Sequence, residues 1–177
     1  MPPLPVTQPP TRLNAALEDA GRSIHHAVGV SHAALDAVHV SHLLAGRLAA
    51  RAYGLDCAVA DVSYVVFPGA HIVRAGMVYL RPGVPVAVGT VPISYLRIGS
   101  DFSASILLEE PAIGAMPPVL PLGYLVVTML RPGPHQDIAA VRGLLSNGAD
   151  AARIRPLVEG VAPDLLGKFD RLVGAPR

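Results

Sequence analysis

The chain has 177 residues, of which 51% are hydrophobic and 15% are charged, and its formal net charge at pH 7 is +1. Disordered chains combine low hydrophobicity with high net charge, so this composition excludes disorder and fits a globular domain with its own core. Nucleic acid is not an expected partner, because no cluster of Lys and Arg is present to neutralise phosphates. The single cysteine, Cys57, cannot form an internal disulfide and gives no sign of secretion.

No membrane span or signal peptide is expected. The charge-free run 112–130 has the length of a span, but three prolines interrupt it. Residues 1–10 hold five prolines, with neither a basic flank nor an apolar stretch, and predict a loose tail. We therefore expect a cytoplasmic protein. Its few charged residues leave much apolar surface exposed, which favours a homo-oligomer.

Beyond the tail, the first part of the chain is predicted to be helical. Gly29 is expected to interrupt the helix, and Ser31 to cap a second helix that extends to Tyr53, with Gly54 just past its end. A restart at Ser41 would divide this second helix in two. The apolar residues that set the first helical period are Leu13, Ala16, Leu17, Ala20 and Ile24.

The middle of the chain predicts strands. Residues 56–67 are rich in Val and aromatic residues, which are typical of a strand. Residues 71–81 and 84–96 predict an antiparallel hairpin, because Pro82 and Gly83 suit the central positions of a type II turn.

The remaining elements complete an α+β prediction. A short helix is expected over 100–110, a strand over 119–131, and helices from residue 136 with breaks at Gly148, Pro156 and Pro163. Strands joined by tight turns pair antiparallel. We therefore predict one domain, residues 11–177, with an antiparallel meander, helices at both ends and one inserted helix.

One face of the predicted hairpin carries small residues around a single arginine. Glycines facing each other in paired strands give up packing, and they often mark a place where a ligand approaches the backbone. Arg74 could bind a carboxylate there in bidentate fashion. Alternatively, the glycines ease the twist of the sheet and Arg74 reaches solvent. The face consists of Arg74, Gly76, Val78, Ala87, Gly89 and Val91.

Five histidines lie between residues 25 and 42. On a continuous helix, His32, Asp36 and His39 would share a face, and such ligands could hold zinc or iron. A solvated or oligomer-facing helix explains them equally well, and no HExxH motif accompanies them, so no metal is expected. Ser41 and His42 form a separate polar pair, expected at a helix start facing a pocket, where they could handle protons.

Motifs for bound cofactors are absent from the sequence. It contains no GxGxxG, no GKS or GKT and no CxxC. Lys168, the only lysine, lies in a polar-faced terminal helix and is a poor candidate for a Schiff base. Residues 29–33, GVSHA, look like part of a nucleophile elbow, but too few residues precede them to form the strands that an elbow requires. We therefore expect a protein without a cofactor.

An ordered series of segments lies between Ser41 and Leu130. It comprises AYG at 52–54, DCAVADVSYVVF at 56–67, VRAGMVYLRPGVPVAVGTVPISYL at 73–96 and EPAIG at 110–114. This series resembles the chorismate pyruvate-lyase family. The resemblance implies that family's fold, an enclosed cavity and a substrate carboxylate bound by Arg74. The family's late-strand Glu is replaced by Met129 here.

Together, these features predict a cofactor-independent enzyme of secondary metabolism. It would catalyse an elimination or a cyclisation, including pericyclic cyclisation, of a small, largely apolar carboxylate or carbonyl substrate. Arg74 would anchor the substrate, and His42 or Ser41 would move the proton. Two alternatives stay open: a genuine chorismate lyase that forms 4-hydroxybenzoate, and a non-catalytic effector-binding domain. The expected substrate-binding residues are Gly76, Val78, Ala87, Gly89, Val91 and Met129.

Overall fold

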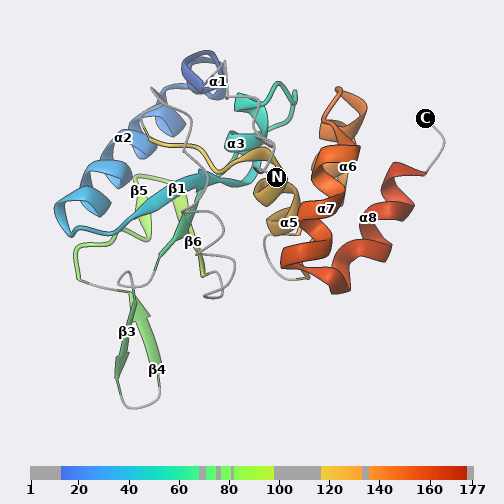
Figure 1. The fold of residues 1–177 in the computed structure, drawn as a ribbon. Helices are drawn as coiled ribbons and strands as arrows, with labels where there is room; N and C mark the ends of the chain where they lie inside the picture. Colours follow the sequence, from blue (N-terminus) through green and yellow to red (C-terminus); the bar gives the residue numbers. More distant parts are fainter. Residues whose placement is uncertain are drawn as a thin grey trace.

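The structure of the protein, a computed structural model, describes residues 13–67, 71–74, 77–80, 82–97, 117–132 and 136–174 (Figure 1). Its helices are α1 (Leu13–Ala20), α2 (Arg22–Ala37), α3 (Gly46–Ala52), α5 (Leu122–Leu130), α6 (Ile138–Ser146), α7 (Ala151–Val161), the short 3₁₀ helix η1 (Pro163–Leu165) and α8 (Leu166–Val173). Its strands are β1 (His42–Ala45), β2 (Val62–Val66), β3 (His71–Arg74), β4 (Met77–Leu80), β5 (Ala87–Val88) and β6 (Val91–Arg97). The predicted α+β class is confirmed.

The main sheet is mixed, so the predicted antiparallel meander is wrong. Four strands pair in the order β1-β2-β6-β5, while β3 and β4 form a separate two-stranded ribbon. Strand β2 is antiparallel to β1 but parallel to β6. The chain between β2 and β6 acts as a crossover that carries the ribbon and β5, and β6 therefore returns in the same direction as β2.

The predicted hairpin between residues 71–81 and 84–96 is also wrong, because each run folds back on itself. Arg74 pairs with Met77 in the ribbon, and Val88 pairs with Val91 in the main sheet. The second turn contains Gly89, whose φ is +59°. A two-residue hairpin loop favours glycine at its first central position, whereas a type II turn at Pro82 and Gly83 would splay the strands.

Two predicted elements differ in secondary structure from those that the structure shows. Residues 119–131 were expected to form a strand, but α5 begins after Pro121, and all nine of its residues are buried. An apolar run buried on every side has no period that distinguishes helix from strand. The second predicted helix is replaced by three elements, because α2 continues through Gly29 and Ser31 and ends at Ala37, before β1 and α3.

Other predictions from local signals hold. Gly54 follows the end of α3 with a φ of +90°, and Gly148 separates α6 from α7 with a φ of +97°. Pro163 opens η1, as expected of a break, whereas Pro156 lies inside α7 without ending it. The helix expected over 100–110 lies outside the described residues.

Helix α3 links the main sheet to the C-terminal helices. It packs against β1 and β2 of the sheet and against α5 and α6 of the C-terminal helices. Figure 1 shows α6, α7 and α8 beside one another on the side of the molecule away from α2. On that other side, α2 packs against β2, β5 and β6, and this contact positions the site described below. Among the described helices, none is long and apolar enough to span a membrane.

Two glycines provide a matched test of this fold. Gly46 has a φ of +66°, and a Cβ atom there would lie 3.0 Å from both Cβ and Oγ of Ser63. Gly29 is exposed inside α2, and a Cβ atom there would meet no atom within 4 Å. We expect Gly46→Ala to lower the free energy of unfolding by about 1–2 kcal/mol. Gly29→Ala should raise it by about 0.5–1 kcal/mol, because alanine is the better helix former.

Urea unfolding followed by circular dichroism measures both changes. A loss of stability in Gly29→Ala would contradict the continuous course of α2. An unchanged stability in Gly46→Ala would contradict the close approach of α3 to β2.

Candidate functional site

The site forms where the chain leaves α2 and enters β1. Val40 N donates to Leu35 O and His39 N donates to Asp36 O, both at 2.9 Å. His39 adopts a φ of +54°. These features form a Schellman motif, in which one residue in the left-handed region reverses the chain after a helix. The reversal brings His42, the first residue of β1, back over the last turns of α2.

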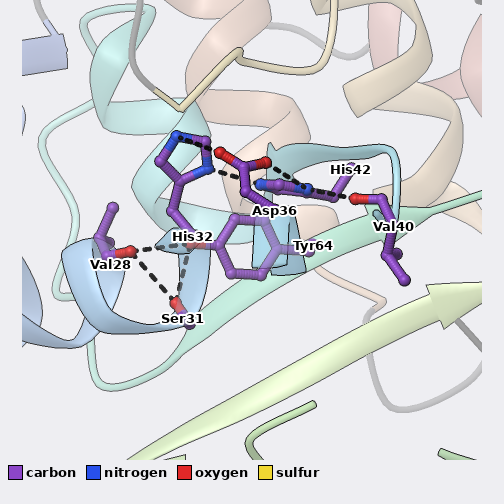
Figure 2. Close-up of polar contacts among 7 residues, drawn as sticks. All are labelled: Val28, Ser31, His32, Asp36, Val40, His42 and Tyr64. Atoms are coloured by element: carbon purple, nitrogen blue, oxygen red, sulfur yellow. Dashed lines mark hydrogen bonds and ion pairs between the residues drawn. The ribbon is translucent and has the colours of Figure 1, made fainter. Parts of the chain in front are cut away.

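Three ionisable side chains meet at this reversal (Figure 2). His32 Nδ1 lies 2.7 Å from His42 Nε2, and His42 Nδ1 lies 2.7 Å from the carbonyl oxygen of Val40. Asp36 Oδ2 lies 3.6 Å from His32 Nε2, and Asp36 Oδ1 lies 4.0 Å from His42 Nδ1. We refer to His32, Asp36 and His42 as the histidine cluster.

The hydrogen bonds fix which nitrogen atoms carry protons. A backbone carbonyl only accepts hydrogen bonds, so His42 Nδ1 must carry a proton and donate it to Val40 O. Burial lowers the pKa of His42, because the charged ring would lose hydration. In its neutral form His42 Nε2 is a bare acceptor, and His32 must therefore donate to it from Nδ1.

This chain of hydrogen bonds ends at His32 Nε2, an acceptor atom that has no donor among the described residues. When His32 is neutral, its proton lies on Nδ1 and Nε2 holds a free lone pair. Among the side-chain nitrogen and oxygen atoms that the structure describes, His32 Nε2 is the buried one without a hydrogen-bond partner. Its near neighbour is the Asp36 carboxylate, which is also only an acceptor. Two acceptors 3.6 Å apart are stabilised by a cation between them, either a proton or a metal ion.

A buried pair of hydroxyl groups supports the cluster from below. Ser31 Oγ donates to Ala27 O at 2.6 Å and lies 2.9 Å from the hydroxyl oxygen of Tyr64 on β2. The Tyr64 ring meets the His42 ring edge to face, with centroids 5.3 Å apart. Burial raises the pKa of Tyr64 to about 12, so its hydroxyl keeps its proton at neutral pH. Tyr64 thus holds α2 and His42 in fixed relative positions.

A cleft of about 580 Å³ opens beside the cluster. Its walls combine the three cluster residues with exposed polar groups and a small apolar surface. Asp36 is the member most open to solvent, with 59% of its side chain exposed, against 15% for His32 and 3% for His42. The other lining residues are His39, Val40, Ser41 and Pro118.

The sequence-predicted residues are distributed over several places. Ser41 and His42 both border the cleft, but they precede and begin a strand rather than a helix. His39 was expected to join His32 and Asp36 on one helical face; it lies beyond the end of α2, and His42 occupies the third position instead. No sequence signal marked His42 as their partner, because the contact depends on the chain reversal.

The predicted face around Arg74 does not form. Arg74 belongs to the β3–β4 ribbon, whereas Ala87 and Gly89 are exposed residues of the β5–β6 hairpin, and Val91 is buried in β6. The physical reason is the pairing of each run with itself. Gly76 and the side chains of Arg74 and Val78 lie outside the described part of the chain, so the role predicted for Arg74 stays a prediction.

Met129 lines a second cavity, of about 200 Å³. Arg47 and Asp137 also line this cavity and pair with each other at 2.6 Å. Asp137 additionally accepts a hydrogen bond from Ala140 N at the start of α6. The polar groups of this cavity thus already have partners, and the free lone pair of the histidine cluster makes the first cleft the stronger candidate.

Comparison with known proteins adds no relative: no family model, curated protein or solved structure matches this chain. The resemblance to the chorismate pyruvate-lyase family stays a prediction.

The hydrogen-bond chain predicts the tautomers of two histidines. In ¹⁵N-labelled protein above pH 7, long-range proton–nitrogen correlation spectra should show His42 and His32 protonated on Nδ1. His25, which is exposed on α2, serves as the control and should show the tautomer mixture of a free imidazole. A proton on Nε2 of His42 would contradict its bond to Val40.

Proposed function

We propose that the protein is an enzyme that removes a proton from a small molecule bound in the cleft, with Asp36 and His32 as the general-base pair. The reaction would be an elimination or a cyclisation of a carboxylate or carbonyl substrate, with no organic cofactor. The observation that carries this proposal is the bare, buried His32 Nε2 lying 3.6 Å from a carboxylate that is open to the cleft.

The order of exposure in the cluster supports a direction of proton transfer. Asp36 faces the cleft and is the group that a substrate would meet. When a substrate C–H bond breaks, the Asp36 carboxylate takes the proton and can pass it to His32 Nε2. The electron pair left on the substrate then forms a double bond and expels a leaving group with its bonding pair. Alternatively, it adds to a carbonyl carbon of the same molecule, and the carbonyl oxygen takes up the displaced electron pair and then the proton. His32 Nε2 can hold this proton, because the atom has no other hydrogen-bond partner.

The rest of the cluster stabilises the charge that this step creates. A proton on Nε2 makes His32 an imidazolium, with Asp36 on one side and the neutral His42 Nε2 accepting on the other. The Val40 carbonyl holds His42 in the tautomer that can accept. His42 is therefore a positioning residue, in the way that a buried carboxylate orients the histidine of a catalytic triad.

The cleft also offers groups that could orient a substrate. Ser41 and His39 are exposed at its rim and could donate hydrogen bonds to a carboxylate or carbonyl oxygen. Val40 and Pro118 add apolar surface against which a ring could pack. This mixture of mostly polar walls with a small apolar surface suits a small molecule that combines a polar group with a ring.

A second candidate is the lyase reaction on chorismate itself. It is favoured by the ordered series of segments between Ser41 and Leu130 that resembles the chorismate pyruvate-lyase family. This candidate function also implies that the protein has the fold of that family. The parallel pairing of β2 with β6 departs from the antiparallel meander that the tight turns in the sequence predicted.

A substrate that needs only a base tests the first candidate. The ring of 5-nitrobenzisoxazole opens when one carbon-bound proton is removed: the N–O bond breaks and a coloured phenolate forms. The protein should open this ring faster than free imidazole at equal concentration. Asp36→Asn and His32→Gln should each lower the rate by about 10²–10⁴-fold, as for the loss of a positioned base.

Matched variants make this test specific. His25→Gln changes an exposed histidine of the same helix and should keep the wild-type rate. Wild-type protein that is no faster than imidazole, or His32→Gln that is as fast as wild type, would overturn the general-base proposal.

Incubation with chorismate tests the second candidate. Chromatography of the mixture should reveal 4-hydroxybenzoate and pyruvate in equal amounts if the protein is a chorismate lyase. Calorimetry on the same mixture detects binding. Binding of chorismate with no product would instead support an effector-binding domain.

A further inference from the structure

We propose that the histidine cluster is also a binding site for one divalent transition-metal ion, with His32, Asp36 and His42 as ligands. This inference goes beyond the proposed function, because the metal would take the same lone pair that the proton-transfer reaction needs. It is carried by the geometry of the three side chains.

The chemistry of the three ligands suits such an ion. Two imidazoles and one carboxylate form a set that zinc, cobalt and nickel bind well, with open positions left for water or a substrate. One donor atom from each residue lies within 4.8 Å of the others, and this is the one such group among the described residues. Asp36, which is 59% exposed, provides a route for the ion from solvent.

One distance within the cluster is already close to that between two ligands of a tetrahedral ion, and the donor atoms of all three residues lie within 4.8 Å of one another. His32 Nε2 and Asp36 Oδ2 are 3.6 Å apart. Two ligands of a tetrahedral zinc ion, each bonded at about 2.0–2.1 Å, lie about 3.3 Å apart. Only a small shift of the exposed Asp36 side chain would close the difference. His32 would give up no hydrogen bond at Nε2, because that atom has none.

His42 is already oriented as metal-binding histidines usually are. Its Nδ1–H donates to the Val40 carbonyl, which leaves Nε2, 2.7 Å from His32 Nδ1, as the atom that could bind a metal. Ligand histidines commonly make such a bond to a backbone carbonyl from their second nitrogen, since it fixes the tautomer and raises the basicity of the ligand atom. To reach an ion held by His32 Nε2, His42 Nε2 would give up its hydrogen bond to His32 Nδ1, and the two rings would turn relative to each other.

Burial supports the same conclusion. An unpartnered lone pair in a buried position costs free energy, and the structure keeps one beside a carboxylate. A metal ion would bind the lone pair of His32 and the Asp36 carboxylate together, and it would release any proton held between them. Metal and proton therefore compete for His32 Nε2.

Cobalt provides a probe that needs no enzyme activity. Untagged protein should bind one Co²⁺ per chain and show the intense visible absorption of a tetrahedral site, and Zn²⁺ should abolish this absorption. Equilibrium dialysis should show His32→Gln, Asp36→Asn and His42→Gln weakening Zn²⁺ binding by at least about 100-fold. Circular dichroism and a melting curve of each variant establish that it is folded.

Two control variants sharpen the result. His25→Gln makes the same change at an exposed position of α2 and should leave the affinity unchanged. His39→Asn removes the histidine that the sequence alone placed in the set, and asparagine tolerates the left-handed conformation found there. It should also bind normally. Failure of the wild-type protein to bind Co²⁺ or Zn²⁺, or equal weakening in His25→Gln or His39→Asn, would overturn the proposal.

The two proposals have separate outcomes. If both hold, Zn²⁺ should slow the opening of 5-nitrobenzisoxazole by wild-type protein in proportion to the occupied fraction of the site. Cobalt binding with no ring opening would overturn the proposed function and leave the metal site standing. Ring opening with no cobalt binding would overturn the metal site and leave the proposed function standing.

Discussion

The backbone reversal at the end of α2 is the feature on which the site depends. His39 must adopt a left-handed φ of +54°, a conformation that costs a residue with a side chain about 1–2 kcal/mol. The hydrogen bonds from Val40 to Leu35 and from His39 to Asp36 help to offset that cost, because they satisfy carbonyl groups at the helix end. Without this turn, His42 would continue away from α2 and would not meet His32.

The same reversal links the site to the sheet. It delivers the chain into β1, which pairs antiparallel with β2, and β2 carries Tyr64 beneath the cluster. Tyr64 reaches back to Ser31 on α2 through a buried hydroxyl contact. The cluster therefore lies between two elements that are fixed to each other by packing and by hydrogen bonds, which is how rigid sites are generally supported.

Within this frame, the electrostatic character of the site comes from one unmatched atom. Val40, His42 and His32 form a chain in which each acceptor has a donor, until the chain ends at His32 Nε2. Asp36 then places a negative charge beside a lone pair rather than beside a proton donor. A proton and a metal ion both relieve this arrangement, and for that reason the two proposals concern the same place and predict competition.

The sequence by itself determined the parts of the fold that depend on local signals. The class, the C-terminal helices and the chain reversal at Gly54 follow from apolar spacing and from residues that favour particular φ angles. It also showed a histidine-rich segment, which metal ligands and a solvated helix explained equally well. Tertiary structure decided the rest. Burial on every side made α5 look like a strand, and pairing across the sheet divided one expected hairpin into two. His42 takes the place of His39 in the cluster because His39 adopts a left-handed backbone conformation. The sequence has no glycine or asparagine there to predict that conformation. The hydrogen bonds and packing of the folded chain hold His39 in it, and not the preference of a histidine.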